Sequence, residues 1–242
     1  MICIYFLSFA TSNWKQSKLR YIEQLDVIQK NFNLFKDIYL YNENDLDSEY
    51  WKYIENKITV KDGYYLWSWK PYIILNTLNK INDGDYLLYM DGGCSLYDYK
   101  NFETSKNILT EKCFMLNENV FIALNHINPR NCPIKIQIRK DVLEDLNLSN
   151  DNYFLNEFPH YQANVILLYK CDKCVNFIYQ WLKCFDLYHK SVNHRCHDKK
   201  NQLGYFYRNN GDQGFLQALL YKNNTKVLDI QEYKKYVKRI KK

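Results

Sequence analysis

Residues 63–96 read GYYLWSWKPYIILNTLNKINDGDYLLYMDGGCSL, and the fold class can be inferred from this segment. Ser68 is placed to cap a helix, and Pro71 fits the first turn of that helix, where its missing N–H costs nothing. The apolar residues that follow continue the helix as far as the turn-forming Asn-Asp-Gly at residues 82–84. Residues 85–91 then form a short, mostly apolar run that predicts a central strand. A helix followed at once by a buried strand is the repeating unit of an α/β sheet.

The rest of the chain alternates between the same two patterns. Apolar runs predict strands at residues 2–9, 37–41, 113–125 (one or two strands), 161–169 and 226–228. Helical periodicity or capping residues predict helices at residues 13–31 with Asn13 as the cap, 45–56, 98–110, 171–188 and 212–221. Residues 126–156 predict loops with short helices, and residues 189–210 predict a long polar loop. We therefore predict one α/β domain over residues 1–242, with a Rossmann-like, mostly parallel sheet flanked by helices.

Composition indicates a folded, basic protein. Hydrophobic residues make up 47% of the 242 residues, which favours a buried core over disorder. The net charge is +6, and the basic residues are spread along the chain except in residues 233–242, YKKYVKRIKK. We interpret this segment as a solvated terminal helix whose lysines complement the helix dipole. Peripheral contact with anionic lipid headgroups is the alternative.

The cysteines and the N-terminal segment indicate a cellular compartment. Several of the eight cysteines lie in apolar segments, where a free cysteine behaves as a small hydrophobe. Residues 1–10, MICIYFLSFA, have no basic leader, so we interpret them as a first strand rather than a signal peptide. No stretch approaches the ~20 apolar residues that a membrane-spanning helix needs. We expect a soluble, cytoplasmic protein with free thiols.

The end of the central strand is the first candidate site. Asp91, Gly92 and Gly93 follow the apolar run at the edge where open α/β sheets bind ligands. A carboxylate there can hold a ribose hydroxyl or a metal ion, and the glycines let a diphosphate approach the backbone. An ordinary turn is the alternative interpretation, because an isolated Asp-Gly-Gly is common.

Two further segments strengthen this candidate. Residues 67–71 place two tryptophans and Lys70 at a helix N-terminus, where anions bind. We expect either Trp67 or Trp69 to lie in the core. Asp212 and Gln213 begin an apolar helix late in the chain, where an aspartate is also a good N-cap.

These segments together resemble a known enzyme class. The stretch 63–96 resembles a group of uncharacterised bacterial and viral glycosyltransferases, in which a Trp-Lys-Pro helix precedes a strand ending Tyr-x-Asp-x-Gly-Cys. More distantly, the chain resembles the retaining GT-A enzymes of the galactosyltransferase and glycogenin type. In those enzymes a strand ends in Asp-x-Asp, another carries an Asn, and an Asp-Gln pair begins a late helix. The matching residues here are Asp91, Asn164, Asp212 and Gln213.

The resemblance implies a GT-A fold and a role for each matching residue. Asp91, with Gly92 and Gly93, would bind the nucleotide ribose or a divalent metal ion. Trp69 and Lys70 would lie near the donor, and Ser8 and Thr11 would border the base. Asn164 and Asp212 would hold the donor sugar, and Gln213 would lie near the anomeric carbon, so that Asp212 and Gln213 are the expected catalytic pair. The cation aimed at the leaving diphosphate is the main requirement of such a reaction.

The resemblance also implies the reaction. We expect a glycosyltransferase that moves a sugar from a nucleotide-diphosphate sugar, UDP-sugars being favoured, to a glycan, protein or lipid-linked acceptor. Retention of anomeric configuration is favoured. The acceptor is expected to contact the weakly patterned residues 126–156 and 189–210, since variable loops carry specificity.

Two departures from the distant family leave dependence on Mn²⁺ or Mg²⁺ open. The second Asp of the Asp-x-Asp motif is Gly93 here, and no histidine follows His197. Hard divalent ions bind several oxygen ligands, and Asp91 is the one candidate ligand that the motif retains. Lys70, Arg195 or Arg208 can replace the ion as a cation for the phosphates.

Three other interpretations stay open. Cys171 and Cys174 have the spacing of a zinc knuckle, with further Cys and His downstream, but no second knuckle has clean spacing, so we expect no zinc. A basic, aromatic-rich chain can bind nucleic acid, but the basic residues do not cluster with the aromatic ones outside the C-terminal segment, so we expect no nucleic-acid partner. The missing second Asp also allows a degenerate protein that binds a sugar nucleotide without turning it over.

Overall fold

The computed structural model describes residues 2–59, 63–96, 103–188, 211–234 and 237–239. The loop expected at residues 189–210, which includes Arg195 and Arg208, lies outside these residues. None of the described helices is long and apolar enough to cross a membrane.

The core of the structure is a six-stranded sheet with the strand order β2-β1-β3-β6-β5-β7. Its strands are β1 (Ile4–Phe9), β2 (Phe35–Tyr41), β3 (Tyr86–Asp91), β5 (Ile122–Ile127), β6 (His160–Tyr169) and β7 (Val227–Asp229). Strand β1 pairs in parallel with β2 and β3, and β5 pairs in parallel with β7. Strand β6 runs antiparallel to both of its neighbours, β3 and β5. The mostly parallel α/β sheet that the sequence predicts is therefore confirmed.

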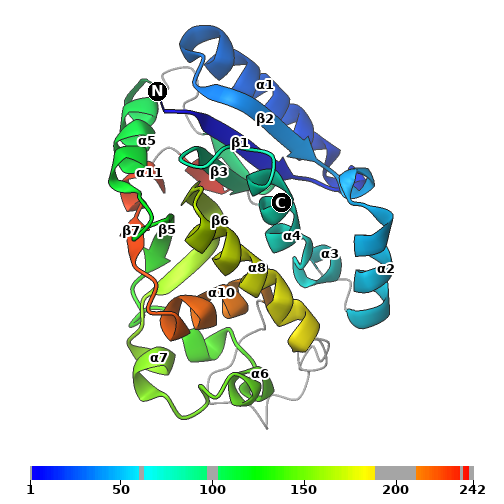
Figure 1. Cartoon of the computed structure of the whole chain (residues 1–242), viewed down its shortest axis with the longest axis vertical. Coiled ribbons are helices and arrows are strands. Elements are labelled where there is room, and N and C mark those ends of the chain that lie inside the picture. The colour runs from blue at the N-terminus through cyan, green and yellow to red at the C-terminus, as the bar shows by residue number, and fades with distance from the viewer. Residues whose placement is uncertain (1, 60–62, 97–102, 189–210, 235–236, 240–242) are drawn as a thin grey trace.

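Helices cover both faces of this sheet (Figure 1). The helices of the described residues are α1 (Lys15–Phe32), α2 (Ser48–Lys57), α3 (Gly63–Leu66, a short segment with non-helical backbone angles), α4 (Trp69–Leu78), α5 (Glu103–Met115), α6 (Lys140–Asp145), α7 (Asn152–Asn156), α8 (Asp172–Leu187), α10 (Gly211–Lys222) and α11 (Gln231–Lys234). One apolar cluster joins α2, α4, α8 and α10 to the sheet, and a second joins α1, α5 and α11 to it. Strand β3 serves both clusters, because Leu87 and Tyr89 face the first while Leu88 and Met90 face the second.

Two boundaries and one helix cap differ from the sequence-based expectations. Residues Ser12–Trp14 form a 3₁₀ turn, so α1 begins at Lys15 rather than being capped by Asn13. Helix α5 continues to Met115, past the expected start of a strand at residue 113, because Cys113 is buried against the second apolar cluster. Ser68 precedes α4 but makes no capping hydrogen bond, because its backbone already has helical angles (φ −59°, ψ −28°); its hydroxyl accepts a hydrogen bond from Tyr50.

The C-terminal segment also differs from expectation. Instead of one terminal helix it contains the short α11 and the strand β8 (Val237–Arg239). Strand β8 pairs antiparallel with β4 (Cys94–Leu96), which follows directly on the glycine turn after β3. The open edge of β4 supplies hydrogen-bond partners that a terminal helix would not use, and this overrides the helical interpretation of the basic residues.

Candidate active site

The candidate site lies where the strand order reverses. The chain passes from β1 to β2 on one side of β1 and returns to β3 on the other side. Because β1 and β3 are parallel and Phe9 is paired with Asp91, both strands end at the same edge of the sheet. The crevice beyond the carboxyl ends of strands at such a reversal is where open α/β sheets bind ligands.

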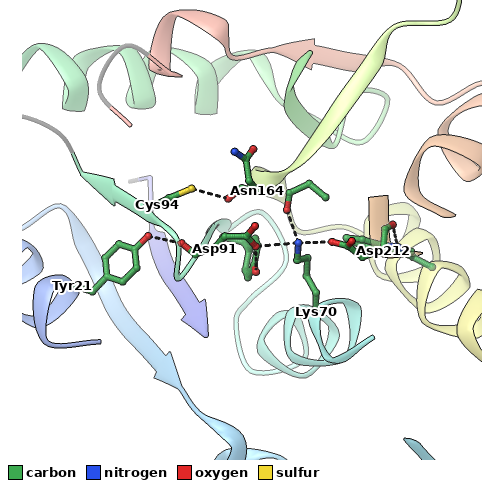
Figure 2. A network of polar contacts seen from close by, with 9 residues as sticks. Tyr21, Lys70, Asp91, Cys94, Asn164 and Asp212 are labelled. Carbon is green, nitrogen blue, oxygen red and sulfur yellow. Dashed lines mark hydrogen bonds and ion pairs between the residues drawn. The ribbon is translucent and has the colours of Figure 1, made fainter. Parts of the chain in front are cut away.

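Lys70 projects from the first turn of α4 into this edge (Figure 2). Its ammonium lies 3.0 Å from Asp91 Oδ1 and 2.5 Å from Asp212 Oδ2. It also donates a hydrogen bond of 3.0 Å to the carbonyl oxygen of Ala163 on β6. The three N–H groups of a lysine are matched by these three acceptors. Lys70 therefore joins the end of β3, the start of α10 and the middle of β6.

The carboxylates of Asp91 and Asp212 offset the unfavourable effect of burial on the charge of Lys70. Burial alone would lower the pKa of Lys70, whose side chain is only 2% exposed, but Asp212 and Asp91 raise it, and its net pKa lies above 10.5. The ammonium therefore stays protonated at neutral pH. The side chain of Asp91 is 27% exposed and that of Asp212 is 7% exposed. Asp91 is thus the member of this charged trio that a ligand can reach most directly.

Asp91 is held by two tyrosines. Tyr89 donates a hydrogen bond of 2.6 Å to Asp91 Oδ1, because residues two apart in a strand point to the same face. Tyr21 on α1 donates one of 2.8 Å to the backbone carbonyl of Asp91 (Figure 2). These contacts fix both the carboxylate and the backbone from which the glycine turn begins.

The two glycines of the turn have different surroundings. A Cβ on Gly92 would lie 2.6 Å from the carbonyl oxygen of Phe9, whereas a Cβ on Gly93 would meet nothing within 4 Å. The close approach of the Phe9 carbonyl therefore requires a glycine at position 92, whereas the space beside Gly93 is open. Arg20 on α1 donates hydrogen bonds of 2.7 Å to the carbonyls of Gly92 and Cys94. Sequence reasoning missed Arg20, because helix α1 carries no pattern that marks it as facing this turn.

The start of α10 places Asp212 and Gln213 side by side. The backbone carbonyl of Asp212 accepts a hydrogen bond of 2.9 Å from the indole of Trp181 on α8, and its carboxylate binds Lys70. The amide of Gln213 contacts His160 at the start of β6 and Gln137. Sequence reasoning did not identify these partners, because each lies far from Gln213 along the chain.

Asn164 does not join the charged trio. Its side chain points away from Lys70 (Figure 2) and lines a cavity of about 40 Å³ on the other side of β6, together with Asn125 and Tyr233. Its Oδ1 is buried and has no hydrogen-bond partner among the described residues. The donor-sugar contact expected for Asn164 therefore requires a different side-chain conformation and stays a prediction.

The remaining expected donor contacts differ in accessibility. Trp69 is 6% exposed and stacks on Phe9 with a ring-centre distance of 4.0 Å, so it is the tryptophan that belongs to the core. Ser8 is also buried, at 2% exposure. Thr11 is half-buried and begins the 3₁₀ turn directly after β1, at the ligand-binding edge. Of these three side chains, Thr11 is the best placed to border a base.

An unusual backbone segment precedes Trp69 and Lys70. Residues 64–67 all have φ between 56° and 61°, so the chain makes a left-handed turn there. Side chains in this region cost roughly 1–2 kcal/mol per residue. Such strain persists only where packing enforces it, and it gathers at functional sites. Leu66 within the turn is fully buried, which indicates what holds the segment in place.

The described residues do not form a metal site. Hard divalent ions require several oxygen ligands, whereas Gly93 offers no side chain and Asp91 Oδ1 already contacts Lys70 and Tyr89. Among the described residues no group of His, Cys, Asp and Glu could hold a metal ion. Cys171, Cys174 and Cys184 are buried free thiols, and the other downstream candidates of the zinc hypothesis, His189, His194, Cys196 and His197, lie outside the described residues.

The chain is similar to several proteins of known structure. No family model matches the sequence, and neither does any curated protein. A glycosyltransferase involved in the glycosylation of the major capsid of PBCV-1 is similar at 12% identity and a TM-score of 0.45, over 94% of this chain and 81% of that chain. Mouse xyloside xylosyltransferase 1 is similar at 9% identity and a TM-score of 0.49, over 95% and 84% of the two chains.

The galactosyltransferase LgtC, in complex with donor and acceptor sugar analogs, is similar at 12% identity and a TM-score of 0.43, over 94% of this chain and 73% of that chain. All three of these proteins are glycosyltransferases. Because the TM-scores lie below 0.5, a function for this chain has to be inferred from its own site.

Proposed function

We propose that this chain is a glycosyltransferase of the GT-A type, which transfers a sugar from a nucleotide-diphosphate sugar to a hydroxyl-bearing acceptor. The observation that carries the proposal is the trio of Asp91, Lys70 and Asp212 at the carboxyl edge of β1 and β3. It places charged groups beside a glycine turn at the topological switch point, where nucleotides bind in α/β sheets. The sequence resemblance adds UDP-sugars as the favoured donors.

Each part of the site has a defined task in this proposal. Asp91, partly exposed, accepts hydrogen bonds from the ribose hydroxyls, and Thr11 borders the base. A Cβ placed on Gly93 would meet no described atom within 4 Å, and in this proposal the donor diphosphate lies against that side of the turn. Asp212 is held against Lys70 and orients the donor sugar, while the neighbouring Gln213 faces its anomeric carbon.

The reaction breaks the bond between the anomeric carbon and the diphosphate, whose oxygen keeps the electron pair. A new bond joins the anomeric carbon to an acceptor oxygen, whose proton leaves to the released diphosphate. Negative charge grows on the diphosphate, so a positive environment lowers the barrier. The three N–H groups of Lys70 already have protein acceptors, so direct contact with a phosphate requires that one of them be exchanged.

Retention of configuration, an acceptor that is a glycan, protein or lipid-linked saccharide, and acceptor contacts along residues 126–156 belong to the same proposal. Within that segment, α6 and α7 lie close to the end of the molecule that carries α10 (Figure 1). The basic C-terminal segment would offer peripheral contact with an anionic membrane surface.

The test is thermal unfolding of the purified chain with UDP, GDP and a panel of their sugars, each with and without Mn²⁺. A donor at 100 times its dissociation constant stabilises the folded state by about 2.7 kcal/mol, which raises the melting temperature by roughly 5–10 °C. We expect Asp91→Ala to abolish the shift and Asp26→Asn, which changes a surface carboxylate of 55% exposure, to preserve it.

Turnover is then measured as release of the nucleoside diphosphate. Binding without turnover would support the degenerate sugar-nucleotide-binding protein instead. No shift with any sugar nucleotide, or an undiminished shift in Asp91→Ala, would overturn the proposed site.

A further inference from the structure

A closed ring of hydrogen bonds joins four residues, which are Gln213, His160, Gln137 and Cys132. His160 Nδ1 lies 2.9 Å from the backbone carbonyl oxygen of Cys132. His160 Nε2 lies 2.5 Å from Gln213 Nε2, which also donates to Gln137 Oε1 at 3.2 Å. Gln137 Nε2 in turn donates to Cys132 Sγ at 3.1 Å, which closes the ring.

The backbone carbonyl of Cys132 determines which atom donates and which accepts in each hydrogen bond of the ring. A carbonyl only accepts, so His160 must carry its proton on Nδ1. In the neutral imidazole, Nε2 is then an acceptor, and the group facing it must be the NH₂ end of Gln213. The same NH₂ group faces Gln137 Oε1, so the orientation of both amides is determined.

The surroundings of His160 keep its imidazole in the neutral form that the ring of hydrogen bonds requires. The side chain is 1% exposed at the start of β6. Burial lowers its pKa below 6.5, although its bond to the Cys132 carbonyl acts in the opposite direction. The imidazole is therefore neutral at pH 7, with one nitrogen that donates and one that accepts.

The ring engages both N–H groups of the Gln213 amide, and no side chain or backbone group of the described residues donates a hydrogen bond to its carbonyl oxygen, which can therefore face a ligand. We infer that His160 and Gln137 are positioning residues that orient the Gln213 amide so that its carbonyl oxygen faces the anomeric carbon of the donor. This inference rests on the proposed function. The anomeric carbon gains positive charge as its bond to the diphosphate breaks. An amide oxygen stabilises that charge, whereas a flipped amide would present N–H groups and oppose it.

Two substitutions at His160 distinguish the roles of its two ring nitrogens. His160→Asn keeps a donor for the Cys132 carbonyl but removes the acceptor for Gln213, and His160→Gln places an acceptor near the position of Nε2. We expect His160→Asn to lower kcat by roughly tenfold, the effect of one lost orienting hydrogen bond, with the donor KM nearly unchanged. His160→Gln should retain most of the activity. Gln137→Met, which removes the second acceptor at similar volume, should lower kcat as well.

A double-mutant cycle shows whether His160 acts through Gln213. If it does, His160→Asn costs no further activity in the background of Gln213→Ala, because the amide to be oriented is gone. A full additional loss in that background would overturn the inference. Equal activity of the Asn and Gln variants at 160, or a wild-type kcat in His160→Asn, would overturn it too.

A spectroscopic readout separates this inference from the proposed function. The ¹⁵N resonances of the His160 ring should show the neutral form with the proton on Nδ1, and His160→Asn should shift the side-chain amide resonances of Gln213. A proton on Nε2 would overturn the ring whatever the activity. If the ring is present but no sugar nucleotide binds or is turned over, the proposed function fails while the ring stands.

Discussion

Replacing Lys70 by methionine tests the charged trio most directly. Methionine keeps an unbranched side chain of similar length but removes the ammonium that binds Asp91 and Asp212. The carboxylate of Asp212, whose side chain is 7% exposed, then has no cationic partner in the described part of the chain, and the carbonyl of Ala163 loses its donor. Removing one partner of a buried ion pair costs about 3–5 kcal/mol. For a chain of this length, that loss lowers the melting temperature by roughly 6–20 °C.

The loss should depend on pH, and its sign follows from Asp212. Burial raises the pKa of Asp212 above its ordinary value of 3.8, and in the variant no lysine opposes that effect. A carboxyl group with a raised pKa in the folded state contributes stability at pH values below its unfolded pKa. That contribution is lost as the pH rises through its folded pKa. Lys70→Met should therefore be less destabilised at pH 5 than at pH 8.

Urea unfolding followed by circular dichroism at both pH values measures these losses. The double variant Lys70→Met with Asp212→Asn should be more stable at pH 8 than Lys70→Met alone, because it buries no unpaired carboxylate from α10. Lys30→Met is the control, since Lys30 is 71% exposed in a surface pair with Asp26 and should change stability by less than about 1 kcal/mol. A Lys70→Met protein that unfolds like this control at both pH values would refute the assigned burial and pairing.

Four further substitutions test the surroundings of the trio and of Gln213. Gly92→Ala brings a Cβ to 2.6 Å from the carbonyl of Phe9 and should cost about 1–3 kcal/mol in thermal unfolding. Gly93→Ala meets no atom within 4 Å, so a loss as large as that of Gly92→Ala would contradict the turn geometry. Tyr89→Phe removes a hydrogen bond of 2.6 Å to a carboxylate and should cost about 1.5–3 kcal/mol in urea unfolding, together with weaker donor binding. Because burial lowers the pKa of His160, the unfolded chain takes up a proton that the folded chain does not, and stability should fall as the pH drops below 6.5. His160→Gln should flatten that slope between pH 7 and 5, and an unchanged slope would assign it to another group.

The position of Asp91 at the edge of the sheet could be predicted from sequence, because it depends on residues that are close together along the chain. The apolar run of β3 ends at Asp91, and two glycines follow. Once the sheet is parallel, the carboxyl ends of β1 and β3 must meet at one edge, so Asp91 was placed correctly. The position of Lys70 in the first turn of α4 was likewise local, since Pro71 fixes where that helix begins.

The partners of these residues could not be predicted, because they depend on tertiary packing. Lys70 and Asp212 are 142 positions apart, and no periodicity relates α4 to α10. A lysine at a helix N-terminus is expected to be solvated and free to bind phosphate, yet Lys70 is buried between two carboxylates. His160 was missed for the same reason, since only folding brings the start of β6 to Gln213.

The C-terminal segment shows the limit of local propensity. Its lysines and arginine suit the end of a solvated helix, but the strand β8 pairs with β4 instead. Edge strands leave N–H and C=O groups unpaired, and a chain segment that meets such an edge gains those hydrogen bonds. The basic composition therefore describes where the charge lies and does not determine the backbone conformation.

Charge balance connects Gly93, which replaces the second Asp of the Asp-x-Asp pattern, with the buried Lys70. The trio contains two carboxyl groups and one ammonium, so its formal charge is one negative. A second carboxylate at residue 93 would add to that charge beside a diphosphate, and only a bound cation could compensate it. Gly93 leaves the space open, and Lys70 lies between the two carboxylates. A buried lysine and a glycine at residue 93 are thus mutually consistent, because each limits the negative charge that the donor diphosphate would meet.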